Sequence, residues 1–414
     1  MIKFSIRDLL WLTFTTALAV AVISNIIFAR AKRRELRSAK AAYELEIQKV
    51  ANPFSVVQRS SILAEQNDQS EKIERQPDVW NVQHSAVDAS LRGLCVVDAK
   101  VVWSSGTGGT VIRTDDGGKS WQNVSVKAAS ELDFRDVQAF DDKKALVLSA
   151  GQPARIYKTV DGGATWKQVF EHDRKESFFD AMSFWDNQRG IAMSDPVDGN
   201  ILLIETLDGG DTWKELPMSA RPKAMRGEGG FAASGTNMTV FGDRCLIALG
   251  SAEKDQQEQT SRVIYSNDRG KTWGSASVPM ARNQSSGIFS LAFARQTGQA
   301  DRKIGIAIGG DYLKPDQTSS NIALTNDGGK TWRKPTGTVP RGFRSCVAYL
   351  GSVAGAQKLV AVGTNGTDIS RDGGENWESA SSQGFHAVAF TPDGKAGWAT
   401  GSDGRVARWQ GVEE

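Results

Sequence analysis

Cysteine and histidine are scarce in this chain of 414 residues, with three of each. Cys95, Cys245 and Cys346 lie far apart in apolar runs, so we expect buried strand thiols and exclude a disulfide framework or a zinc site. Three histidines are also too few for a histidine-rich metal centre. The sequence therefore predicts neither a metal site nor a bound cofactor.

An excess of one charge is also lacking, because 50 Lys+Arg residues face 48 Asp+Glu residues. Residues 1–50 contain nine basic and four acidic residues, so the rest of the chain has 41 basic and 44 acidic residues, a net charge of −3. Such a body has no general affinity for nucleic acid. Glycine and tryptophan, by contrast, are abundant at 42 and 12 residues, which indicates many tight turns beside large apolar side chains.

The N-terminal region contains one long uncharged stretch. It follows a short flank (residues 1–8) and reads LLWLTFTTALAVAVISNIIFA over residues 9–29. As a helix it would span about 30 Å, the thickness of a bilayer core. A cleaved signal peptide is the alternative, but its apolar region is usually shorter. The sequence predicts an uncleaved single-pass anchor, and the basic residues that follow it place the body in the cytoplasm by the positive-inside rule.

The segment after this stretch favours a helix. Residues 30–51 are basic, rich in Ala, Glu, Lys, Arg and Leu, and free of Gly and Pro, which predicts a helical stalk. Apolar residues from Leu36 to Val50 fall on one face, so a short coiled coil, with weak self-association, is the alternative. Residues 52–78 are polar with weak periodicity and are interpreted as a linker.

One motif, repeated six times, organises the rest of the chain. Its pattern is Ser/Thr-x-Asp-x-Gly-x-(Ser/Thr/Asn)-Trp, and its copies end at Trp121, Trp166, Trp213, Trp273, Trp332 and Trp377, which are 45 to 60 residues apart. A period near 45 residues fits four short strands with their turns, which is one blade of a β-propeller.

The chemistry of the motif is structural. The aspartate can accept hydrogen bonds from its own turn, the glycine can take a positive φ, and the tryptophan can start the next strand and bury its ring between sheets. Six equivalent turns cannot all be an active site. We therefore assign a structural role to Asp116, Asp161, Asp208, Asp268, Asp327 and Asp372.

These repeats are identified as Asp-boxes, or BNR repeats, which occur in sialidases, sortilin-type receptors and photosystem II stability/assembly factors. The paired Asp-Gly-Gly form, the dense spacing and the stretch RGEGGFAASGTNM (Arg226–Met238) most resemble the last family and its bacterial relatives. Over residues 80–410 this resemblance implies a seven-bladed propeller, a non-catalytic assembly or scaffold role, and an exported body. It does not cover the anchor or the stalk.

A second repeat lies upstream of the boxes, where an apolar residue opens a short alternating strand. The seven openings are Leu91, Phe134, Phe179, Phe231, Phe289, Phe343 and Phe385. Seven openings predict an all-β, seven-bladed β-propeller over residues 79–410, followed by a tail (411–414). The last copy has room for only three strands. We expect the run Val79–Val82 to supply the fourth and close the ring.

The residue after each opening is expected to face the central channel. These residues are Arg92, Arg135, Asp180, Ala232, Ser290, Arg344 and His386. One interpretation is a cationic channel mouth that binds a carboxylate, a phosphate or an acidic protein segment. The other is that Asp136, Asp180 and Glu228 neutralise the arginines inside the ring. The resembling family also presents arginines on its propeller face, which Arg92, Arg135 and Arg344 approximately match.

The stretch that contains Arg226 and Glu228 is the least repeat-like part of the propeller. Its glycines permit close backbone approach. Two interpretations stay open. The stretch is either a special inner loop that blade four needs to fit the ring, or a contact for a ligand or partner.

Two functions compete. The first is a membrane-tethered, non-catalytic scaffold that binds a protein partner, such as a membrane complex under assembly, through its propeller face. The second is a sialidase-like glycosidase with an arginine cluster, which would need a nucleophile, commonly tyrosine, and a separate acid. Tyr157 and Tyr265 precede Asp-boxes, away from the channel. Tyr349 ends a strand, Tyr312 lies in the irregular loop GGDYLKPD, and the Arg-Ile-Pro opening usual in sialidases is absent. We therefore predict a scaffold and not an enzyme.

Overall fold

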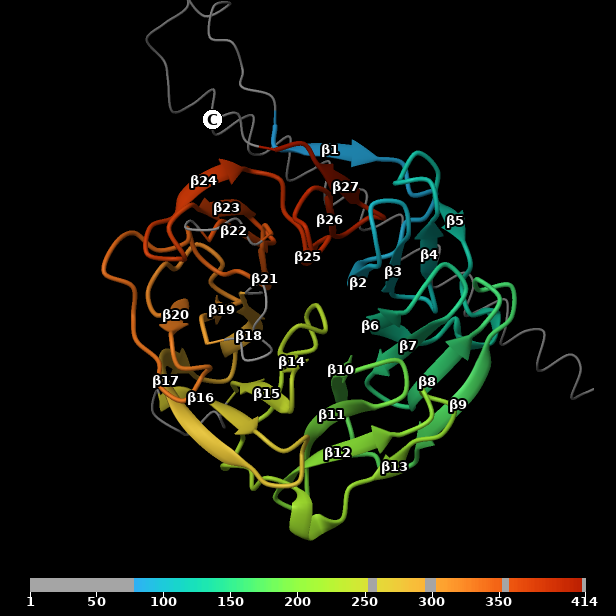
Figure 1. The fold of residues 1–414 in the computed structure, drawn as a ribbon, viewed down its shortest axis with the longest axis horizontal. Coiled ribbons are helices and arrows are strands. Elements are labelled where there is room, and N and C mark those ends of the chain that lie inside the picture. Colours follow the sequence, from blue (N-terminus) through green and yellow to red (C-terminus); the bar gives the residue numbers. More distant parts are fainter. Residues whose placement is uncertain (1–77, 252–258, 295–302, 352–356, 412–414) are drawn as a thin grey trace, which may run out of the picture. The chain divides into compact units, whose positions relative to one another are not determined.

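The computed structural model describes residues 78–251, 259–294, 303–351 and 357–411. The described strands form seven antiparallel sheets around a central axis, which confirms the predicted seven-bladed, all-β propeller (Figure 1). No helix within these ranges is long and apolar enough to cross a membrane. The predicted anchor (9–29), the stalk (30–51) and nearly all of the linker (52–78) lie outside the described residues.

In each blade the strands follow one another outward from the axis, beginning with the innermost (Figure 1). Blade 1 contains β2 (Leu91–Val96), β3 (Val102–Gly106), β4 (Val111–Thr114) and β5 (Gln122–Asn123). Blade 2 contains β6 (Asp133–Ala139), β7 (Ala145–Ala150), β8 (Ala154–Thr159) and β9 (Lys167–His172). Blade 3 contains β10 (Phe179–Phe184), β11 (Gly190–Val197), β12 (Asn200–Thr206) and β13 (Lys214–Glu215). Blade 4 contains β14 (Met238–Phe241), β15 (Arg244–Leu249), β16 (Gln259–Ser266) and β17 (Gly274–Arg282).

The remaining three blades follow the same order. Blade 5 contains β18 (Ser286–Phe293), β19 (Gly305–Asp311) and β20 (Ile322–Thr325). Blade 6 contains β21 (Cys346–Tyr349), β22 (Leu359–Gly363), β23 (Gly366–Ser370) and β24 (Glu378–Ser381). Blade 7 contains β25 (Ala387–Phe390), β26 (Gly397–Thr400), β27 (Val406–Trp409) and β1 (Trp80–Gln83). Two short 3₁₀ helices, Lys127–Ala129 and Met218–Ala220, lie between blades.

The ring closes as the sequence predicts. Strand β1 pairs antiparallel with β27, so that Trp80 lies opposite Trp409 and the first described strand completes the last blade (Figure 1). The Trp80 ring centroid is 5.0 Å from that of Trp409 and 5.2 Å from that of Phe385, and its indole N–H donates to Thr367 Oγ1 of blade 6. This pairing covers the edge of blade 7.

Blade 5 departs from the four-strand prediction. Its fourth strand is reduced to a single bridge between Leu324 and Arg333. The segment that follows contains Pro335 and Pro340, which have no backbone N–H to donate to a ladder.

The core lies between neighbouring blades. One cluster, for example, joins Leu146 and Ile156 of blade 2 to Phe179 and Leu202 of blade 3, with Trp213 at its outer end. Apolar side chains on both faces of each sheet therefore stabilise the ring by burial.

The Asp-box turns have the predicted geometry. In the first box, Asp116 Oδ1 accepts from the Thr114 hydroxyl (2.7 Å) and from Ser120 N–H (3.0 Å), while Oδ2 accepts from the Ser120 hydroxyl (2.6 Å). Gly118 has a φ of 83° and donates its N–H to Thr114 Oγ1. The same bonds recur in the next four boxes, and in the last box the side-chain amide of Asn376 replaces the second hydroxyl as the donor to Asp372 Oδ2. Each aspartate is therefore occupied by its own turn.

The three cysteines all lie on strands and are free thiols. Cys245 and Cys346 are buried as predicted, whereas Cys95 is only half-buried.

Candidate functional site

A cavity of about 470 Å³ lies where the inner ends of the blades converge. Its lining consists of Arg92, Arg135, Phe178, Gly230, Phe231, Ala232, Ala233, Phe289, Tyr312, Phe343, Ser345, Thr364 and His386. All seven blades, or the segments that lead into their inner strands, contribute to it. We call it the channel-mouth cavity.

Local irregularities in the inner strands place several functional side chains. In β2 the pairing with β3 skips Arg92, because Leu91 lies opposite Gly106 and Gly93 opposite Ser105. The pairing skips Arg135 in β6, Asp180 in β10 and Phe289 in β18 in the same way. An extra, unpaired residue of this kind re-aims its side chain relative to the rest of the strand. Arg92, Arg135 and Phe289 all line the channel-mouth cavity.

Arg92 is the least neutralised of these side chains. It is half-buried, its Nε has no hydrogen-bond partner, and no acidic side chain within the described ranges forms an ion pair with it. Burial, and then the charge of Arg135, lower the pKa of Arg92, while Asp133 acts in the opposite direction. A guanidinium group in this environment is available to an anionic ligand.

Arg135 is held in place by two contacts. Its Nε donates to Asp133 Oδ2 at 2.8 Å, and its Nη1 donates to the carbonyl of Ala232 at 3.1 Å. The second contact ties blade 2 to the chain segment before β14.

His386 lies in the same cavity but is not a cation there. Burial, followed by the charges of Arg92, Arg135 and Arg405, lowers the pKa of His386 to about 3. Its Nε2 lies 3.1 Å from Ser402 Oγ and 3.3 Å from Ser90 Oγ. The positive charge of the mouth therefore comes from the arginines.

The glycine-rich stretch before β14 projects toward the axis of the ring (Figure 1). It lies directly on three acidic side chains. Gly230 N–H donates to Asp195 Oδ1 at 2.8 Å, a Cβ at Gly230 would lie 2.5 Å from Asp180 Oδ2, and a Cβ at Gly235 would lie 2.2 Å from Asp136 Oδ1. Only glycine permits this approach. Blade 4 thus has a special inner segment, and Ala232 is not on an inner strand, since β14 begins only at Met238.

Among the described residues, none of the three acids beneath this segment forms an ion pair with a mouth arginine. Asp180 is 1% exposed, and burial, then the charge of Asp195, raise its pKa well above the ordinary value. Arg135 acts on Asp180 in the opposite direction. Burial also raises the pKa of Asp136 to about 7 and that of Asp195 to about 6.

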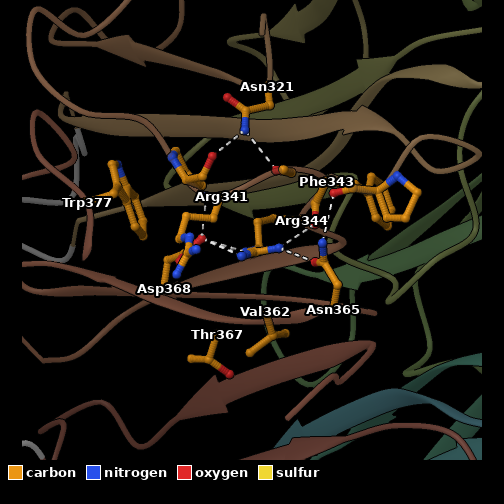
Figure 2. Close-up of polar contacts among 12 residues, drawn as sticks. Asn321, Arg341, Phe343, Arg344, Val362, Asn365, Thr367, Asp368 and Trp377 are labelled. Carbon is orange, nitrogen blue, oxygen red and sulfur yellow. Dashed lines mark hydrogen bonds and ion pairs between the residues drawn. The ribbon is translucent and has the colours of Figure 1, made fainter. Parts of the chain in front are cut away.

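Arg344 does not line the channel-mouth cavity. It lies among polar groups of blade 6, including Asp368 and Asn365 (Figure 2). It is 2% exposed, and its Nη2 and Nε lie 2.6 and 2.8 Å from Asp368 Oδ2. Its Nη1 donates to the Phe343 carbonyl and to Asn365 Oδ1. The structure therefore brings together Arg92, Arg135 and His386 but places Arg344 apart, because β21 begins two residues after it, at Cys346.

Arg226 and Glu228 line a neighbouring cavity of about 510 Å³, which shares Gly230 with the channel mouth. Glu228 is 4% exposed and forms a two-pronged ion pair with Arg262, at 2.6 Å to Nε and 2.5 Å to Nη2. The charge of Glu228 thus balances an arginine of β16 and not those of the channel mouth.

Sequence reasoning missed the aromatic wall of the channel-mouth cavity. Phe231 stacks on Phe289 with ring centroids 4.0 Å apart, and Phe343 meets Phe289 edge-to-face at 4.7 Å. The signal was present in the seven blade openings, which are nearly all phenylalanine, but it was interpreted only as a mark of strands.

The lining contains two arginines and no aspartate or glutamate. A glycosidase needs a carboxylic acid beside its nucleophile, and this cavity does not supply one. Nowhere in the described part of the chain do three His, Cys, Asp or Glu side chains gather in a way that could hold a metal ion. Guanidinium groups can pair with an anionic group, and the aromatic rings of the lining can pack against an apolar or aromatic one.

Comparisons with known proteins agree with this fold. A family model described as "Photosynthesis system II assembly factor YCF48" matches residues 70–176. The structure "YCF48 bound to D1 peptide" aligns with a TM-score of 0.55 and 17% identity over 81% of this chain and 96% of that one. "YCF48 from Cyanidioschyzon merolae" aligns with a TM-score of 0.56 and 17% identity over 80% and 98%. No curated protein matches. The family model confirms the predicted resemblance to the photosystem II stability/assembly factor family over residues 70–176, and the two solved structures confirm the propeller fold.

Proposed function

We propose that this chain, a propeller similar to the photosystem II assembly factor family, is a non-catalytic scaffold that binds a protein partner in its channel-mouth cavity. The propeller fold, the arginines at the mouth and the lack of carboxylates in its lining support this assignment. A solved protein of the same fold is bound to a D1 peptide. By analogy, the partner is a segment of a membrane protein under assembly.

The observation that carries this proposal is the state of Arg92. Its guanidinium group is half-buried, lacks an ion pair within the described residues and lies beside the like charge of Arg135. Arginine is rarely buried without a partner, because desolvation of its charge is costly. A carboxylate supplied by another protein would accept charge-assisted hydrogen bonds from both Arg92 and Arg135.

The N-terminal anchor completes the proposal. Residues 9–29 would hold the propeller beside its partner at the membrane, and the stalk (30–51) would set the distance and allow weak self-association. The positive-inside rule favours a cytoplasmic propeller, whereas the family resemblance favours an exported one. Protease treatment of intact and opened vesicles, with detection of the propeller, would decide between the two sides.

The test compares partner capture by the wild type and by a variant that carries Arg92→Gln and Arg135→Gln. The tagged full chain is cross-linked in its native membranes, solubilised in mild detergent and purified. We expect the co-purifying partner to be lost from the double variant. Arg371→Gln is the matched control, since Arg371 is half-exposed and pairs with Glu378 on the rim of blade 6. Equal capture by the double variant would exclude the channel mouth as the binding site.

A further inference from the structure

The channel-mouth cavity has two chemically different walls. Arg92 and Arg135 form a cationic wall that belongs to blades 1 and 2. Phe231, Phe289, Phe343 and Tyr312 form an aromatic wall that belongs to blades 4, 5 and 6 and to the segments around them. A purely anionic ligand would engage the first wall and leave the second in water.

The aromatic wall is built from rings in fixed mutual orientation. Phe231 and Phe289 stack with an interplanar angle of 9°. The Tyr312 ring meets both edge-on, with centroid distances of 6.3 Å to Phe231 and 6.2 Å to Phe289. Tyr312 is 46% exposed and Phe231 is half-buried, so these rings also face solvent across the cavity. Such a set can accept a further ring in edge-to-face or offset geometry.

Two facing glycines, Gly250 directly after β15 and Gly287 in β18, make room for the Phe231 ring. Gly250 and Gly287 form a bridge between blades 4 and 5, and a Cβ at Gly250 would lie 2.4 Å from Phe231 Cε2. A Cβ at Gly287 would lie 2.9 Å from the same atom and 2.4 Å from the Cα of Gly250. Any larger residue at either position would push Phe231 away from this bridge.

The size of the cavity limits what can bridge both walls. A volume of about 470 Å³ corresponds to a space only ~8 Å across, which extended chain crosses in about two to three residues. The lining of the mouth has a net positive charge, because it contains Arg92 and Arg135 but no acidic side chain, and burial lowers the pKa of His386 to about 3. Asp133, outside the lining, pairs with Arg135.

We propose that the channel-mouth cavity recognises a peptide segment that carries an Asp or Glu side chain within about three residues of an aromatic side chain. The carboxylate pairs with Arg92 and Arg135, and the aromatic ring packs against Tyr312 and Phe231. This inference rests on the proposed function, since it specifies the partner segment for the same cavity.

The experiment begins with selection from a synthetic library of random peptides whose ends are acetylated and amidated, so that only side chains supply carboxylates. The bait is the full chain in mild detergent. We expect selected peptides to combine an acid and an aromatic residue at this spacing. One selected peptide is then resynthesised with Glu→Gln, with Phe→Ala, or with the equivalent changes if it contains Asp, Tyr or Trp.

Two double-mutant cycles test which wall of the cavity binds which side chain of the selected peptide. Tyr312→Ala should weaken binding of the selected peptide about two- to tenfold, but should not change binding of the version in which the aromatic residue is replaced by Ala. Arg92→Gln should weaken binding of the selected peptide, but should not change binding of the version in which Glu is replaced by Gln. Leu313→Ala is the matched control, because Leu313 is 69% exposed, adjacent to Tyr312 and outside the cavity lining. It should bind like the wild type.

The possible failures are distinguishable. Coupling in the arginine cycle without coupling in the Tyr312 cycle, or selected peptides without an aromatic residue, would overturn this inference and leave the proposed function standing. Selection of no peptide, or of peptides that bind every variant equally, would overturn both.

Discussion

Replacement of Arg344 by methionine tests whether this side chain belongs to the binding surface or to the internal structure of blade 6. Arg344 is 2% exposed and the Asp368 side chain is fully buried. Without Arg344, the one donor left to the carboxylate among the described residues is the Arg341 backbone N–H, at 2.9 Å from Oδ2. Removal of one partner from a buried ion pair typically costs about 3–5 kcal/mol, because the other charge stays desolvated.

We therefore expect Arg344→Met to lower the free energy of unfolding by about 3–5 kcal/mol at neutral pH. Burial already raises the pKa of Asp368, and Arg344 opposes that rise. Without Arg344 the folded-state pKa rises further. The deficit should therefore be smallest in acid, where Asp368 is protonated, and should grow as pH rises.

The assay is denaturant unfolding followed by tryptophan fluorescence, at several pH values, with peptide binding measured in parallel. The double variant Arg344→Met/Asp368→Leu should recover much of the loss, since an apolar pair of similar volume is often as stable as a buried ion pair. A loss below ~1 kcal/mol, together with abolished peptide binding in a folded variant, would refute the structural interpretation of Arg344.

Three further predictions address the acids, the closure and the glycine-rich stretch. Asp180→Asn should become more stable relative to the wild type as pH rises from about 4 to 8, because the raised pKa of Asp180 in the folded state destabilises the wild type only where this acid must ionise. A difference in unfolding free energy that does not change with pH would contradict this. Trp80→Ala should lower the free energy of unfolding by about 3–5 kcal/mol, since the Trp80 ring is buried where β1 closes blade 7. A change within experimental error would show that closure of the ring by β1 contributes little to stability. Gly230→Ala should weaken peptide binding and destabilise the fold by about 1–3 kcal/mol, as its Cβ would contact Asp180. Gly199→Ala is the control: its φ of 76° strains any side chain, so it should also lower stability, but it lies outside the channel-mouth cavity and should leave peptide binding unchanged.

The repeat architecture is readable from the sequence because its interactions are local. Every polar contact that defines an Asp-box joins residues two to four positions apart, such as Thr114, Asp116 and Ser120. The count of seven openings then requires a seventh blade, and Val79–Val82 was the one strand-like run available to close it. Blade number and closure therefore follow from the sequence.

The arrangement of the channel mouth was decided by the tertiary structure. The pattern predicted equivalent positions for Arg92, Arg135 and Arg344, yet only the first two are unpaired residues of inner strands that turn into the cavity. In blades 1 to 3 the unpaired residue lies directly after the opening residue, as the pattern predicts. In blade 5 the unpaired residue is the opening residue Phe289 itself, and in blade 6 the inner strand begins only after Arg344. Arg344 instead meets Asp368, which lies 24 positions away.

The sequence by itself determined the ring, since each turn is stabilised by hydrogen bonds within its own few residues. Only the tertiary structure decided which charges stay uncompensated, because compensation depends on residues distant in the chain. Glu228 pairs with Arg262, and His386 is kept neutral by burial and three surrounding arginines. Of the three predicted channel-mouth arginines, Arg135 pairs with Asp133 and Arg344 pairs with Asp368. Arg92 is left without an ion pair within the described residues, because none of their acidic side chains reaches its half-buried guanidinium group.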